Sequence, residues 1–142
     1  MELEENLIKE IASQLEIGLV SFLNLKTGIP IFVPDENDPD AYDSMEFYQE
    51  DLKKINSNQN DYIKIKKMPS GNAFRVMKKF TEGVENRIIQ EKLFQALNKS
   101  KPFRNFRNVI DYNHNVREDW FKFKTQKYIE WVKQNIEYLN KQ

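Results

Sequence analysis

At residues 69–71 (Pro-Ser-Gly) the pattern of apolar residues changes from one that includes β-strands to one that is helical up to the last residue. This change constrains the fold more than any other feature of the sequence. Before it, residues 19–33 and 62–66 have the composition and alternation of β-strands. After it, apolar residues recur at three- and four-residue spacing to the end of the chain, which is typical of helices. We therefore predict an α+β fold: a small three-stranded antiparallel sheet packed with helices, and a helical C-terminal half.

A β-hairpin is predicted over residues 19–33. Its first strand is rich in Val, Leu and Phe, and Gly28 lies in the turn, where a positive φ is needed. Pro30 cannot donate a backbone hydrogen bond, so the returning strand is expected at an edge of the sheet. With residues 62–66 as the third strand, this predicts the strand order 2-1-3.

The N-terminal half also contains two helical patterns. Apolar spacing predicts one helix over residues 2–16, with Gly18 as its C-cap. A shorter helix is predicted over about 45–56, with Asp43 or Ser44 as its N-cap.

Beyond residue 70, we expect the helices to be interrupted. A break is predicted near residues 83–86, because a glycine in this stretch costs roughly 1 kcal/mol of helix stability against Ala. Pro102 suits the first turn of a further helix. Asn115 and Glu118 resemble a capping box that opens a last helix from Val116 to about Leu139.

The last helix has an unusually wide apolar arc, which covers well over half its circumference in a helical projection. A surface helix normally needs little more than a third. The helix is therefore packed on two sides or shares a face with another molecule, which includes a second copy of the chain. Arg117 falls inside the arc, where an arginine needs a carboxylate, a ring face or a ligand as its partner.

Length and composition favour a single domain over residues 1–142, with a sheet-containing half at about 1–68 and a helical half at about 69–142.

The chain has no cysteine, which excludes disulfides and thiolate chemistry. The acidic N-terminus does not resemble a secretory signal, and no apolar run approaches the ~18 residues of a membrane span. We expect a soluble, cytoplasmic protein that does not bind membranes.

The net charge of zero hides an uneven distribution. Residues 1–61 contain fourteen Asp and Glu against four Lys and Arg, and residues 62–142 contain eight against eighteen. Such asymmetry indicates either an acidic partner for the basic half or two halves that neutralise each other in the folded protein.

A recognisable catalytic set is missing. His114 is the only histidine, so neither a Cys–His pair nor a multi-histidine zinc site can form within one chain. The acidic loop at residues 35–43 offers oxygen ligands suited to Ca²⁺ or Mg²⁺, but it lacks the glycine and closing glutamate of an EF-hand. We assign no catalytic residue, no metal ligand and no cofactor, and keep a metal-dependent enzyme that uses this loop as an alternative.

The basic half has one concentrated candidate for binding. Three of the five arginines and six aromatic residues lie between residues 102 and 123. Binding surfaces favour both residue types. The apolar positions have helical spacing, so the rings are expected to be mainly structural. The arginines either bind phosphates or carboxylates of a partner, or are solvated or paired within the chain, as Arg107 can be with Asp111 four residues on. The predicted binding residues are Arg104, Arg107, Arg117, Lys101 and Trp120.

Several short motifs also occur in an order that resembles a known family. They are Thr27-Gly28, Pro34-Asp35, Phe74-x-x-Met77-x-x-Phe80, Leu93-x-x-Ala96-Leu97, Pro102-Phe103-Arg104-x-Phe106-Arg107, Arg117-Glu118-x-Trp120-Phe121-x-Phe123 and Trp131. Over nearly the whole chain this order resembles a bacterial uncharacterised protein family, family 0158 of the UPF series. The resemblance implies a bacterial, single-domain protein in which Phe103, Arg104, Arg117 and Trp120 are a shared signature. It implies no activity and no catalytic residue.

Together, these features favour a non-enzymatic binding or regulatory module. Its partner would be an acidic protein or a nucleic acid, bound through the basic half. Besides the metal-dependent enzyme, the alternative is a structural protein that self-associates through the last helix.

Overall fold

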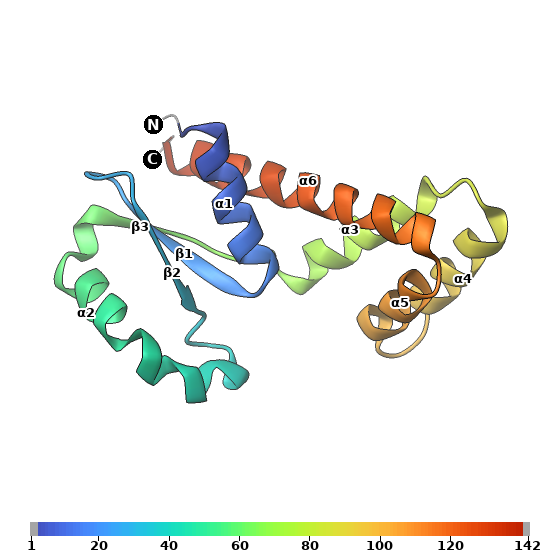
Figure 1. The fold of residues 1–142 in the computed structure, drawn as a ribbon, viewed down its shortest axis with the longest axis horizontal. Helices are drawn as coiled ribbons and strands as arrows, with labels where there is room; N and C mark the ends of the chain where they lie inside the picture. The colour runs from blue at the N-terminus through green and yellow to red at the C-terminus, as the bar shows by residue number, and fades with distance from the viewer. Residues whose placement is uncertain (1–2, 141–142) are drawn as a thin grey trace. The chain divides into compact units, whose positions relative to one another are not determined.

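The computed structural model of the chain describes residues 3–140, except for the side chains of residues 40–43 and Asn140. This range contains six α-helices and a three-stranded antiparallel sheet (Figure 1), which confirms the predicted α+β fold. The chain divides into two compact units. The sheet unit comprises residues 1–67 and 128–142, and the helical unit comprises residues 68–127. The single domain expected from the sequence stays a prediction.

The sheet forms from β1 (Leu19–Asn24), β2 (Pro30–Pro34) and β3 (Tyr62–Ile65), in the predicted order β2-β1-β3. The hairpin turn places Gly28 at φ 74°, which a glycine adopts without a steric penalty. Pro30 begins the edge strand β2, where its missing N–H breaks no ladder. The predicted hairpin is confirmed: Gly28 lies in the turn, and the returning strand lies at an edge of the sheet.

One face of the sheet packs on α1 (Glu5–Glu16) and on the C-terminal part of α6 (His114–Asn140). The buried side chains of this core are Ile8, Ile11, Ala12, Leu15, Ile65, Ile129, Val132 and Ile136. The Trp131 Nε1–H donates to the carbonyl oxygen of Lys66 at 2.8 Å, which joins α6 to the end of β3. Gly18 follows α1 at φ 99°, as expected of a residue that ends a helix in the left-handed region.

The other face of the sheet is covered by α2 (Gln49–Ser57), and Figure 1 shows α1 and α2 on opposite sides of the strands. Val20, Val33 and Ile55 are buried here. The helix starts later than predicted, because residues 39–48 wind as the 3₁₀-helix η1 (Pro39–Tyr48). Tyr48 occupies the N-cap position, so the prediction of Asp43 or Ser44 as the cap was wrong.

The helical unit consists of α3 (Ser70–Glu82), α4 (Arg87–Leu97), α5 (Pro102–Asp111) and the first part of α6. The predicted break follows α3, and the Asn86 side chain caps α4 by accepting from the Ile88 and Ile89 N–H groups at 3.0 and 3.2 Å. Pro102 lies in the first turn of α5, as predicted. The core of the unit contains Met77, Phe80, Leu93, Leu97, Phe106, Ile110 and Trp120.

The long helix α6 begins at His114, two residues earlier than predicted. The Arg117 N–H donates to the Asn113 carbonyl at 2.9 Å, so Asn115 lies inside the first turn and the predicted capping box was wrong. The wide apolar arc consists of two stripes: Trp120 belongs to the core of the helical unit, and Ile129, Val132 and Ile136 belong to that of the sheet unit. Within residues 3–140, no helix is both long and apolar enough to cross a membrane.

Candidate binding surface of the helical unit

The positive charge of the C-terminal half is concentrated in the helical unit. Residues 68–127 contain thirteen Lys and Arg against six Asp and Glu, whereas the sheet unit contains nine against sixteen. A formal charge of this size attracts anions over distances comparable to the Debye length, about 10 Å at 0.1 M salt. The helical unit is therefore the part of the chain with the stronger attraction for anions.

The amphipathic helix α5 directs two of the predicted binding residues to solvent. It buries Phe106 and Ile110 in the core and leaves Arg104 and Arg107 exposed. The two arginines are three residues apart, so they are neighbours on the helix surface. Because its buried face fixes the rotation of α5, the two guanidinium groups emerge from a rigid element.

Lys101 precedes this helix and is exposed. It is the one residue other than glycine with a positive φ in the described part of the chain, at φ 54° and ψ 56°. A left-handed conformation costs a residue with a Cβ roughly 1 kcal/mol or more. The Asn105 side chain stabilises this turn by donating from Nδ2 to the Ser100 carbonyl oxygen at 2.8 Å.

Arg117, in the first turns of α6, has both a carboxylate and a ring face as partners. Its Nε lies 3.6 Å from Asp111 Oδ1, and its guanidinium carbon lies 5.3 Å from the centroid of the Phe121 ring. These contacts provide two of the partners that its position in the apolar arc required. The sequence also suggested a pair of Arg107 with Asp111, but among the described residues Asp111 pairs with Arg117.

Arg117 of α6 thus pairs with a carboxylate of the helix that also carries Arg104 and Arg107. In a helical projection of α5, Asp111 lies between Arg104 and Arg107, and its side chain contacts Arg117 from α6. We call this group, Arg104, Arg107, Arg117 and Asp111, the arginine cluster. Its formal charge is positive by two.

Trp120 does not belong to the exposed surface. It is 9% exposed, and its ring packs edge-to-face against Phe80 and Phe106, with centroids 5.2 and 5.0 Å away. Its contacts are those of a core residue that holds α3, α5 and α6 together. The structure therefore places Trp120 in the core, in contact with Phe106 on the buried face of α5.

Other rings remain exposed around the cluster. Phe103 and Phe121 are half-exposed, and Tyr112, directly after α5, is 89% exposed. The sequence patterns did not single out Tyr112, although its position between a helix end and a polar turn was a usable signal for exposure. Exposed rings next to arginines suit contacts with planar groups, such as bases or other guanidinium groups.

The acidic loop has mainly structural contacts. Asp35 Oδ1 accepts a hydrogen bond from the Asn37 N–H at 3.1 Å, and Asp38 Oδ2 lies 3.7 Å from Lys67 Nζ. Among the described side chains, no group of three or more acidic, His or Cys residues is arranged to hold a metal ion. The side chains of Asp40 and Asp43 lie outside the described residues. His114 is exposed and lies 3.4 Å from Glu118.

The fold and the surface define a small α+β protein with a basic helical unit that presents an arginine cluster. The chain belongs to the family described as Uncharacterised protein family (UPF0158), whose family model matches residues 1–142, so the resemblance read from the motifs is confirmed. Comparisons with curated proteins and with solved structures found no match. The family description names no activity, so a function has to be argued from the surface itself.

Proposed function

We propose that this protein is a non-enzymatic binding module whose arginine cluster binds the phosphates of single-stranded nucleic acid. The observation that carries the proposal is the ion pair of Arg117 with Asp111, a carboxylate of the helix that also carries the exposed Arg104 and Arg107, in a unit with thirteen basic and six acidic residues. Guanidinium groups bind phosphate oxygens in a bidentate manner, with stronger hydrogen bonds than neutral donors make.

Arg117 is available to a phosphate in spite of its ion pair. The side chains of Arg117 and Asp111 are 47% and 49% exposed, and pairs this exposed contribute only about 0.2–1 kcal/mol. A phosphate can therefore displace Asp111 at little cost. In the free protein, Asp111 and the Phe121 ring hold the guanidinium beside α5.

The exposed rings favour single-stranded nucleic acid over an acidic protein. Base stacking on an aromatic side chain is worth roughly 1–3 kcal/mol and needs unpaired bases. Phe103 and Tyr112 lie at the two ends of α5, on either side of Arg104 and Arg107 in the sequence. An acidic protein would use the arginines and gain little from these rings.

The two alternatives from the sequence have less support. Asp35 and Asp38 of the acidic loop already take part in a turn and an ion pair. Most of the apolar arc of α6 lies in the two cores, which leaves Phe121 and Tyr138 as its exposed large apolar side chains in the described range. A metal-dependent enzyme and self-association through α6 both stay predictions.

The test is fluorescence anisotropy with labelled single-stranded RNA, single-stranded DNA and duplex DNA at several salt concentrations. Binding should be tightest for the single strands, and the double variant R104A/R107A should weaken it by about tenfold for each arginine. The slope of log K against log salt should fall by roughly 0.7 for each phosphate that the variant no longer neutralises.

The matched control is R75A/R87A, which removes two exposed arginines of the same unit outside the cluster. It should retain most of the affinity, because it changes the net charge equally but leaves the cluster intact. An equal loss of affinity in both variants would show that net charge alone drives binding and would refute a localised site. Absence of binding at micromolar protein and low salt would refute the proposal, as would polyglutamate binding more tightly than RNA.

A further inference from the structure

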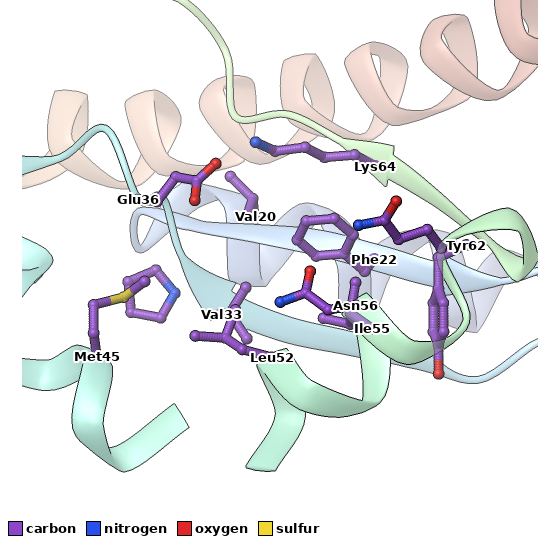
Figure 2. A pocket seen from close by; sticks show the side chains of 12 residues that line it. Val20, Phe22, Val33, Glu36, Met45, Leu52, Ile55, Asn56, Tyr62 and Lys64 are labelled. Atoms are coloured by element: carbon purple, nitrogen blue, oxygen red, sulfur yellow. The ribbon is translucent and has the colours of Figure 1, made fainter. Parts of the chain in front are cut away.

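The sheet unit contains a cavity of about 370 Å³ on the face of the sheet that α2 covers (Figure 2). Its residues come from all three strands, from the loop after β2, from α2 and from the 3₁₀-helices η1 and η2 (Gln59–Asp61), and all belong to the sheet unit. The volume falls within the range of small-molecule sites, which is roughly 300–1,000 Å³. The cavity shares no residue with the arginine cluster.

The larger part of the lining is apolar. Val20 and Val33 form a buried part of the sheet surface, and Ile55 faces them from α2. Phe22 and Leu52 also line the cavity but remain partly exposed. The short helix α2 therefore leaves apolar surface at the cavity that the chain itself does not cover, and an apolar group of a ligand could bury it.

Two opposite charges lie at one side of this apolar lining. The Lys64 ammonium lies 5.8 Å from the centroid of the Phe22 ring, and Glu36 extends from the loop after β2. Figure 2 shows the two charged ends turned toward one another. Yet in the described part of the chain no ion pair within 4.0 Å joins them to each other or to a third residue.

We propose that this cavity binds a zwitterionic α-amino acid with a large apolar side chain. The ligand carboxylate would pair with Lys64, its ammonium group with Glu36, and its side chain would pack on Phe22 and the apolar lining. The amides of Asn56 and Gln59, which also line the cavity, can donate to the carboxylate.

The presence of both charges determines the ligand class. A fatty or aryl acid would pair with Lys64, but its carboxylate would be repelled by the nearby Glu36. A simple amine would pair with Glu36, but its positive charge would be repelled by Lys64. A zwitterion meets both groups with complementary charges. An aromatic side chain fits the lining well, because it can pack against the Phe22 ring in an offset or edge-to-face arrangement.

The experiment is isothermal titration calorimetry of the full chain with three probes: L-phenylalanine, 3-phenylpropionate and phenethylamine. The two analogues each lack one charge of the amino acid. We expect L-phenylalanine to bind at least tenfold more tightly than either analogue. Lys64→Met should remove the preference over phenethylamine, and Glu36→Gln the preference over 3-phenylpropionate.

Matched controls come from α2, where Lys53 and Glu50 are exposed and do not line the cavity. Lys53→Met and Glu50→Gln should leave binding unchanged, and Leu52→Trp should abolish it by filling the cavity. The circular dichroism of each variant should show an intact fold. Equal affinities for the three probes would overturn the proposal, and so would no heat at ligand concentrations on the order of 10 mM. Unchanged binding by Leu52→Trp would place the ligand elsewhere and overturn it too.

Discussion

The neighbouring residues Trp120 and Phe121 offer a direct test of how the helical unit is built. Trp120 is 9% exposed and packs edge-to-face on two rings, whereas Phe121 is 46% exposed. Replacing a buried Phe or Trp by Ala typically costs about 3–5 kcal/mol, and each aromatic pair adds about 0.5–1.5 kcal/mol beyond area burial. Trp120→Ala should therefore lower the free energy of unfolding by roughly 4–5 kcal/mol.

Phe121→Ala should cost far less. Full burial of a Phe side chain is worth about 1.5–3 kcal/mol, so a half-exposed ring contributes about 1 kcal/mol. Its interaction with the Arg117 guanidinium adds about 0.5 kcal/mol, the usual value at an exposed site. The loss in the free energy of unfolding should thus be roughly three times larger for Trp120→Ala than for Phe121→Ala, although the two residues are adjacent on one helix.

The assay is urea unfolding followed by circular dichroism and by tryptophan fluorescence. The chain has two tryptophans, and Trp131 lies in the sheet unit. In Trp120→Ala, fluorescence reports on the sheet unit alone, so a single coincident transition in both signals would mean that the two units unfold together. Equal destabilisation by the two variants, or a Trp120→Ala protein as stable as the natural chain, would refute this packing of the core.

Two further predictions concern single residues. Burial and, to a smaller degree, the Glu16 charge raise the pKa of Tyr128 above its ordinary value of 10.0, so the folded state favours the neutral phenol and stability should fall as the pH rises above 10. Tyr128→Phe should flatten that fall in urea unfolding measured at increasing pH, and a slope equal to that of the unsubstituted chain would contradict the assignment. Lys101→Gly should raise the free energy of unfolding by about 0.5–1 kcal/mol, because glycine adopts the left-handed conformation without a Cβ clash but loses more backbone entropy on folding. Lys99→Gly, an exposed position without a positive φ, should instead be destabilising, and a loss of stability in both variants would argue against strain at Lys101.

The parts of the fold that could be predicted depend on local chemistry. Gly28 and Pro30 each impose a backbone constraint that few arrangements satisfy, so they identified the turn and the edge strand. The start of α2 was missed because η1 winds as a 3₁₀-helix, whose tighter turn does not follow the 3.6-residue pattern of apolar side chains. At the start of α6, two asparagines flank His114, and the sequence does not show which of them precedes the helix.

The candidate sites depend on interactions between elements, which the sequence predicts only in part. The apolar surroundings of Arg117 showed that it needed a partner, but Asp111 becomes that partner only because α5 and α6 are close in space. The nearer candidate within α5, Arg107, is favoured by sequence spacing alone. The cavity of the sheet unit could not be predicted, because Glu36 and Lys64 belong to different elements and share no motif.

The division of α6 between two cores has a consequence for synthesis on the ribosome. Residues 68–127 of the helical unit are contiguous, so that unit has its complete core once residue 127 has emerged. The sheet unit is interrupted, and its core lacks Ile129, Val132 and Ile136 until the end of α6 is made. Although domains usually fold from the N-terminus as they appear, here the later segment should fold first, and the earlier strands must wait for α6.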